Sequence, residues 1–187
     1  RCVRYAFELA QRRERRHVTL VHKTNVLTFA GDLWERTFIE IAAEYPDTET
    51  AYNHVDAACI YFVQDPHRYD VVVTDNLFGD ILSDEAAMLT GSIGMLPSAS
   101  LGSEGPGLFE PVHGSAPDIA GQDKANPMAM VLSAAMMLRI GLKQAAAADD
   151  LEAAVDAVLA GGFRTGDLMA EGCTQQGCRA MGEQLLK

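Results

Sequence analysis

Apolar and polar positions follow two alternating patterns over the first half of the chain. Short runs rich in β-branched residues predict buried strands, whereas apolar residues spaced three or four apart predict amphipathic helices. The expected helices span residues 2–15, 32–45, 55–63 and about 79–89, and the expected strands span 17–21, 50–53 and 71–74. Helix and strand therefore alternate along this part of the chain, which predicts a layered α/β architecture.

The pattern changes after residue 90, where five glycines and two prolines lie between Thr90 and Gly107. This stretch is expected to be mostly loop, with short strands near 98–101 and 108–110. Asn126–Pro127 predicts the start of a helix that reaches about residue 140 and is buried, because it is apolar on nearly every side. Two later helices are expected, one capped by Asp149 or Asp150 and ending at Leu159, the other at 174–186. The glycine-rich change predicts two lobes, residues 1–90 and 91–187.

Composition narrows the class of protein. The 187 residues are 48% hydrophobic and 22% charged, which is typical of a globular protein, and no apolar run is long enough to span a membrane. The net charge of -11 argues against general nucleic-acid binding, because the phosphates would be repelled. The one basic cluster, Arg12, Arg13, Arg15 and Arg16, is expected to decorate the exposed end of a helix rather than to bind an anion.

The cysteines indicate a reducing compartment, and we therefore expect a cytoplasmic protein without a secretory signal. The four of them lack the spacing of a zinc site or of a CxxC motif, and a chain of this size does not need disulfides to fold. They are Cys2, Cys59, Cys173 and Cys178.

Asp80 and Asp84 are the first candidates for chemistry. Their spacing of four residues on a predicted helix places both carboxylates on one face, one turn apart. Like charges at this spacing cost a few tenths of a kcal/mol, which a divalent cation bound by oxygen ligands would offset. The pair also follows a predicted strand, where open α/β sheets place ligands. A metal site is one reading, and a solvated acidic helix face is the other.

Three further features are candidates with weaker local signals. Lys23 follows a predicted strand and lies beside Asn25, as a catalytic lysine or an ordinary surface lysine would. Asp56 opens a helix, where a carboxylate is favoured by the helix dipole. The loop from His113 to Gly121 is rich in small residues, so its backbone can approach a ligand closely. No GxGxxG occurs anywhere in the chain, so the Rossmann fingerprint is absent.

Several motifs together carry a resemblance to a known family. They are HKTNVL around Lys23, NLFGDILSD at 76–84, EPVHGSAPDIAG at 110–121, ANP at 125–127 and RTGDL at 164–168. In this order they resemble the β-decarboxylating dehydrogenases, which include the isocitrate, isopropylmalate, homoisocitrate and tartrate/malate enzymes. MLPSAS at 95–100 and RTGDL favour the members that act on 3-isopropylmalate in leucine biosynthesis. The resemblance implies the two-lobed fold of that family, which is not a Rossmann fold.

The resemblance implies a metal-assisted reaction in a site shared between the two subunits of a homodimer. Mg²⁺ or Mn²⁺ would bind the substrate oxygens, held by Asp80 and Asp84 of one subunit and Asp56 of the other. Lys23, also donated across the dimer, matches the lysine that accepts the proton of the substrate hydroxyl. Asn25 matches a residue near the nicotinamide. The substrate is expected to be a small 2-hydroxy dicarboxylate, oxidised and then decarboxylated.

The resemblance also assigns the cofactor. The NAD loop matches His113, Gly114, Ser115, Ala116, Asp118 and Ile119, with Asn126 beside the adenine. A carboxylate such as Asp118 accepts hydrogen bonds from ribose hydroxyls and repels a 2′-phosphate. NAD is therefore expected rather than NADP.

The chain departs from the family pattern at its beginning. It opens without Met inside a helical pattern, which predicts that it is part of a longer polypeptide. The family's N-terminal portion, with the arginines that clamp the substrate, the substrate-recognition residues and a catalytic tyrosine, has no match here. The isolated chain is therefore expected to be inactive. The alternatives are a tartrate/malate-type enzyme, a non-catalytic subunit of the family or a purely structural α/β domain; the retained Asp56, Asp80 and Asp84 favour an enzyme.

Overall fold

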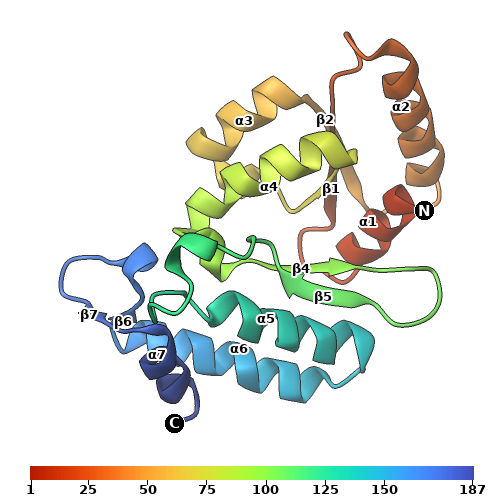
Figure 1. Ribbon diagram of the computed structural model, residues 1–187. Helices are drawn as coiled ribbons and strands as arrows, with labels where there is room; N and C mark the ends of the chain where they lie inside the picture. The colour runs from red at the N-terminus through yellow and green to blue at the C-terminus, as the bar shows by residue number, and fades with distance from the viewer. The chain divides into compact units, whose positions relative to one another are not determined.

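The computed structural model describes all 187 residues, which form two compact units, Arg1–Leu89 and Thr90–Lys187. Helices and strands alternate through the first unit, as the sequence predicts (Figure 1). The elements are α1 (Cys2–Ala10), β1 (His17–His22), α2 (Thr28–Ala42), β2 (Glu49–His54), α3 (Val55–Gln64), β3 (Val71–Val73) and α4 (Asn76–Thr90). A single 3-10 turn at Pro66–Arg68 leads into β3.

The strands of this unit form one parallel sheet in the order β2-β1-β3. β1 pairs with β2 from His17–Glu49 to His22–His54, and with β3 from Val18–Val71 to Leu20–Val73. Because the strands are parallel, their carboxyl ends lie at one edge of the sheet, where ligands bind in open α/β sheets.

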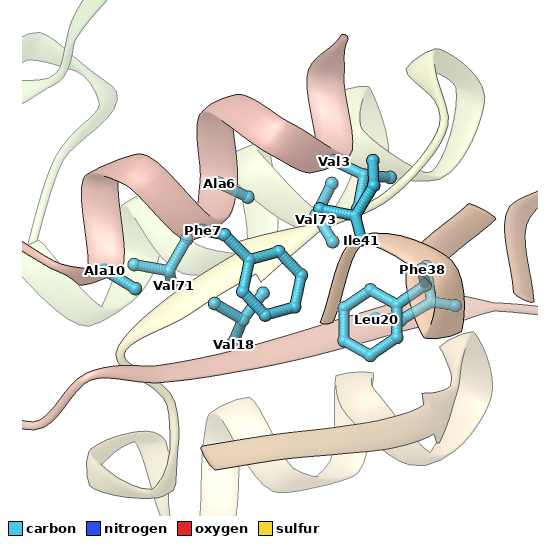
Figure 2. Close-up of a cluster of buried hydrophobic side chains, with 10 residues drawn as sticks. All are labelled: Val3, Ala6, Phe7, Ala10, Val18, Leu20, Phe38, Ile41, Val71 and Val73. Carbon is cyan, nitrogen blue, oxygen red and sulfur yellow. The ribbon is translucent and has the colours of Figure 1, made fainter. Parts of the chain in front are cut away.

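Alternation along the strands gives each face of the sheet its own hydrophobic core. On one face Val18, Leu20, Val71 and Val73 pack against α1 and α2, around the fully buried ring of Phe7 (Figure 2). Val21 follows Leu20 on β1 and therefore faces the other side of the sheet. There it packs with residues of α3 and α4, namely Ala58, Phe62 and Leu82. The unit is therefore a three-layer α/β/α sandwich, with β1 buried on both sides.

Helix α1 ends at Ala10, not near Arg15 as predicted. The arginines after it bind other parts of the chain: Arg13 forms an ion pair with Asp70, and Arg15 donates to the backbone carbonyls of residues 67–69. Arg16 has a positive φ of 49° and turns the chain into β1. Arg13 and Arg15 thus hold the α1–β1 turn against the turn before β3. This structural role differs from both the exposed helix end and the anion site considered from the sequence.

Two other helices of the first unit begin earlier than predicted. α2 begins at Thr28 rather than Asp32. α4 begins at Asn76 rather than near Gly79, because Asp75 caps it: its Oδ1 accepts a hydrogen bond from the backbone N–H of Phe78 at 2.9 Å. A carboxylate that accepts this N–H satisfies one of the free donors of a helix start.

The second unit contains a hairpin, a small parallel pair of strands and three helices. Antiparallel β4 (Pro97–Ser100) and β5 (Leu108–Pro111) lie near the predicted strands, and β6 (Phe163–Arg164) pairs in parallel with β7 (Thr174–Gln175). The helices are α5 (Met128–Met136), α6 (Ala145–Ala160) and α7 (Cys178–Leu185), and α5 continues into a π-helical turn at Met137–Gly141. One core of Met128, Val155, Val158 and Met181 joins the three helices.

The helix starts of this unit also differ from the prediction. Pro127 lies at the N-cap position of α5, and the Asn126 side chain accepts the backbone N–H of Met128 at 2.9 Å. The helix is not buried all round, because Met130 is 58% exposed. α6 begins at Ala145 because the alanine run has the highest helix propensity and needs no Asp cap. α7 begins at Cys178, since residues 174–175 pair in β7.

None of the helices combines the length and the apolar character that a membrane-spanning helix requires.

Candidate active site

The Lys23 ammonium and the Asp56 carboxylate form an ion pair at the carboxyl edge of the first unit's sheet, with Nζ 2.6 Å from Oδ1. Lys23 is the residue after β1, and Asp56 is the second residue of α3, directly after β2. Because His22 and His54 are paired in register, Lys23, one residue after His22, comes close to Asp56, two residues after His54. The sequence singled out both residues, and the fold brings them together.

The environment of this pair differs on its two sides. The Lys23 side chain is 23% exposed, whereas that of Asp56 is 67% exposed. The hydrogen bond from Lys23 is the main cause that lowers the pKa of the Asp56 carboxyl below its usual range. Asp56 is therefore a carboxylate at neutral pH, open to solvent on the side away from Lys23.

A tyrosine that the sequence reasoning missed fixes the loop after Lys23. The Tyr52 hydroxyl, on β2, lies 2.8 Å from Nδ1 of His54 and 3.0 Å from Oγ1 of Thr24. It also accepts the backbone N–H of Thr24 and donates to the carbonyl of His22. Asn25 follows in this tight turn with its side chain exposed. Only the register of two parallel strands brings Tyr52 here, so no local signal could have identified it.

Asp80 and Asp84 lie one turn apart on α4, and both are exposed. Neither carboxylate takes part in an ion pair or a side-chain hydrogen bond, since the one bond at Asp80 is from Ser83 to its backbone carbonyl. No group of three or more His, Cys, Asp or Glu side chains in the chain lies close enough together to hold a metal ion. Within one chain, Asp56 is therefore not assembled with Asp80 and Asp84.

A buried histidine lies directly behind Lys23. His22, the last residue of β1, is fully buried, and its Nε2 lies 3.0 Å from Oδ2 of Asp75. Its ring contacts Phe78 edge-on, with centroids 5.5 Å apart. The sequence analysis singled out neither residue; the cap that Asp75 forms for α4 is a local signal that could have identified one of them.

The second unit contains a cavity of about 940 Å³. Six of the seven predicted cofactor residues line it: His113, Gly114, Ser115, Ala116, Ile119 and Asn126. Asp118 is not among the lining residues; it is exposed in the 3-10 turn Pro117–Ile119. The turn is entered through Ala116, whose φ of 42° lies in the left-handed region that residues other than glycine adopt uncommonly.

Asp167 of the RTGDL motif holds one wall of this cavity together. Its Oδ2 accepts hydrogen bonds from the Ser92 hydroxyl and, at 3.0 Å, from Nδ2 of Asn126. Burial by itself would raise the pKa of Asp167, but hydrogen bonds from Ser92, Thr165 and Asn126 outweigh it and lower the pKa. The sequence motif was noted, but the role of this residue depends on contacts across 41 and 75 residues of chain.

Comparisons with known proteins identify the family of the chain. The family model for isocitrate/isopropylmalate dehydrogenase matches residues 1–185. The chain belongs to this family.

Individual members of the isocitrate/isopropylmalate dehydrogenase family align along the whole chain. The 3-isopropylmalate dehydrogenases of Synechococcus sp. (strain CC9605) and Synechocystis sp. (strain ATCC 27184 / PCC 6803 / Kazusa) are 74% identical over 187 residues and 62% identical over 186 residues. Each alignment covers 100% of this chain, with 52% of the first relative and 51% of the second. The chain thus spans about half the length of the curated relatives it matches.

Solved structures of the family share the fold. An isocitrate dehydrogenase from Methylococcus capsulatus superposes with a TM-score of 0.92 at 46% identity, over 98% of this chain and 53% of that one. A β-decarboxylating dehydrogenase from Thermococcus kodakarensis gives a TM-score of 0.84 at 38% identity, over 98% and 52%. The predicted fold class is confirmed.

Proposed function

We propose that the complete enzyme containing this chain oxidises and decarboxylates 3-isopropylmalate to 2-oxoisocaproate, with NAD as oxidant, in leucine biosynthesis. The observation that carries the proposal is the Lys23–Asp56 ion pair at the carboxyl edge of the sheet. It combines a basic side chain with a carboxylate that is exposed to solvent. The choice of acid rests on the 3-isopropylmalate dehydrogenases that are 62–74% identical, against 46% for the isocitrate dehydrogenase.

The chemistry assigned to the chain's own residues is proton transfer. After its ammonium has released one proton to solvent, the Lys23 amine takes the proton of the substrate hydroxyl while the hydride of the same carbon passes to NAD. The resulting β-keto acid loses CO₂, and the proton returned to the remaining carbanion gives 2-oxoisocaproate. Asn25, exposed in the turn after Lys23, stands at the position proposed to face the nicotinamide.

The donor set fits a hard divalent cation. Asp80 and Asp84 offer unpaired carboxylate oxygens from one helix face, which are the ligands that Mg²⁺ or Mn²⁺ prefers. When bound, the ion would supply Lewis-acid polarisation of the substrate oxygens. Since Asp56 is not assembled with this pair in one chain, we propose that a second copy of the chain donates it together with Lys23, in a homodimer with shared sites.

The cavity of the second unit is the proposed NAD site. Its volume of about 940 Å³ suits a large cofactor, and its lining is mostly small residues and backbone, which permit close approach. We propose that the charge of Asp118, which is exposed in the turn beside the lining, disfavours an added phosphate. We place the enzyme in a reducing cytoplasm because all four cysteines are free thiols.

A steady-state assay of the complete enzyme tests the proposal. It pairs Mg²⁺ or Mn²⁺ with NAD or NADP and compares isopropylmalate, isocitrate, tartrate and malate as substrates. NADH formed fastest with isopropylmalate is the expected result. Faster turnover of another acid would keep the chemistry and reject the substrate, whereas no turnover by a folded dimer would favour a non-catalytic subunit.

A further inference from the structure

The buried contact between His22 and Asp75 joins the two segments that carry the proposed chemistry. His22 immediately precedes Lys23, and Asp75 immediately precedes α4, the helix of Asp80 and Asp84. β3 is paired with β1 so that Val73 lies opposite Leu20, and two residues further along the strands Asp75 reaches the level of His22. The 3.0 Å approach of Nε2 to Oδ2 follows from this register.

Asp75 uses its two carboxylate oxygens for different partners. Oδ1 accepts the N–H of Phe78, and the backbone carbonyl accepts the N–H of Gly79, so the residue caps the first turn of α4. Oδ2 faces His22. A displacement of the histidine therefore acts directly on the start of the helix.

The imidazole ring of His22 has no other polar contact in the chain. It is fully buried, Nδ1 has no hydrogen-bond partner, and the approach of Nε2 to Asp75 is its one polar contact, without the alignment of a directed hydrogen bond. A buried polar ring with this little compensation costs stability compared with an apolar side chain of the same size. An ordinary core position would be filled at less cost by leucine, and such an exception in a native core calls for an explanation.

We propose that His22 is a positioning residue, which through Asp75 sets the end of β1 that carries Lys23 against the first turn of α4. The inference rests on the proposed function for the meaning of Lys23, Asp80 and Asp84. In a dimer with shared sites, one contact then acts on the lysine of one site and on the metal ligands of the other. Loss of the contact should alter both proton transfer and metal affinity without removing any reacting group.

The test uses four variants of the complete enzyme. His22→Leu removes the polar ring, and His22→Gln keeps an N–H donor at the place of Nε2. Asp75→Ser keeps the helix cap, because serine caps helices as well as aspartate does, but is too short to reach His22. The matched control is His17→Leu, at the other end of β1, where Nδ1 is likewise buried without a partner.

Three quantities are measured for each variant: kcat with the best substrate, the Mn²⁺ dissociation constant by direct titration without substrate, and the thermal midpoint. His22→Leu and Asp75→Ser should each lower kcat about tenfold or more, because small misplacements of reacting groups are costly. Both should weaken Mn²⁺ binding several-fold. The double variant His22→Leu/Asp75→Ser should be no worse than either single one, because both remove the same contact. His22→Gln should recover most of the loss, and His17→Leu should stay within about twofold of the parent.

Other outcomes overturn the inference in distinct ways. If His22→Leu changes only the thermal midpoint, or if the effects of His22→Leu and Asp75→Ser multiply in the double variant, the contact is not a positioning device. If the parent enzyme oxidises none of the acids, the proposed function fails, yet unchanged Mn²⁺ affinity in both single variants would still refute the role of the contact.

Discussion

Lys23 Nζ lies 2.6 Å from Asp56 Oδ1 because the two residues follow paired ends of neighbouring parallel strands. Their distance in sequence is 33 residues, but their distance in space is set by the register of His22 with His54. The pairing of the two strands thus brings the two residues together.

Lys23→Met is expected to lower kcat of the complete enzyme by about 10²–10⁴, the usual contribution of a general base. The side chain keeps its length and its packing, so the thermal midpoint should change little. Arg36→Met is the control, since Arg36 is also a cation paired with an aspartate, Asp32. A Lys23→Met enzyme with near-parental kcat would refute the assignment of the base.

Asp80→Asn and Asp84→Asn should each weaken Mn²⁺ binding by at least about tenfold, since even outer-shell changes cost that much. Calorimetric titration of the metal alone gives the constant directly. The folded structure should not suffer, because removal of one charge relieves the repulsion between two exposed carboxylates one turn apart. Asp150→Asn, an exposed acid on α6, provides the control. If all three variants bound Mn²⁺ as tightly as the parent, the proposed metal site on α4 would be refuted.

Gly94→Ala should destabilise the enzyme by about 1–3 kcal/mol and weaken NAD binding, because overpacking displaces its neighbours. A Cβ at Gly94 would lie 2.9 Å from Cβ of Asn126 and 2.9 Å from Oδ2 of Asp167, in the wall of the cavity. Gly182→Ala is the control: nothing lies within 4 Å of its added Cβ, and an alanine within α7 should add about 0.5–1 kcal/mol. Urea unfolding and NAD titration measure the two effects.

Asp70→Asn should cost about 1–3 kcal/mol of unfolding free energy at pH 7, because a nearly buried charged partner of Arg13 is lost. Burial alone would raise the pKa of Asp70, but hydrogen bonds from Arg13 and from the N–H of His17 outweigh it and lower the pKa. A lowered folded-state pKa means that this stabilisation is full above the unfolded value of about 4 and fades as the pH falls below it.

Unfolding midpoints of parent and Asp70→Asn should therefore differ at pH 7 and converge as the pH is lowered below about 4. Glu44→Gln, which breaks an exposed ion pair with Arg4, should show a smaller difference at every pH. A difference between the unfolding midpoints of parent and Asp70→Asn that increases as the pH falls would contradict the lowered pKa assigned to Asp70.

How much of the fold the sequence predicts depends on whether the deciding contact is local. The valines of β3 and the alternation of the first unit are local signals, and the structure confirms them. Beyond the end of α1, Arg15 binds carbonyls 52 to 54 residues away, whereas the start of α4 is set by a local cap, Asp75, that the apolar periodicity does not contain. Periodicity contains no information on such contacts.

The residues of the candidate site differ in the same way: some belong to recognisable motifs, and others matter only through contacts between distant segments. Lys23, Asp56, Asp80 and Asp84 come from motifs and from the family resemblance, and their assignment to base and metal ligands stays a proposal. Tyr52 and His22 could not be predicted, because the importance of Tyr52 arises from the pairing of β1 with β2 and that of His22 from the pairing of β1 with β3. Asp167 was within a recognised motif, but its partners Ser92 and Asn126 lie in other segments.

Since Lys23 is bound to Asp56 of its own chain while Asp80 and Asp84 lie apart from both, the homodimer proposed above would draw the two halves of each site from different chains. Two variants that are each inactive would then complement one another in a mixed dimer. A dimer built from one Lys23→Met chain and one Asp80→Asn chain would gather both defects in a single site and leave the other site whole. Mixing two inactive proteins would restore turnover, as in interallelic complementation.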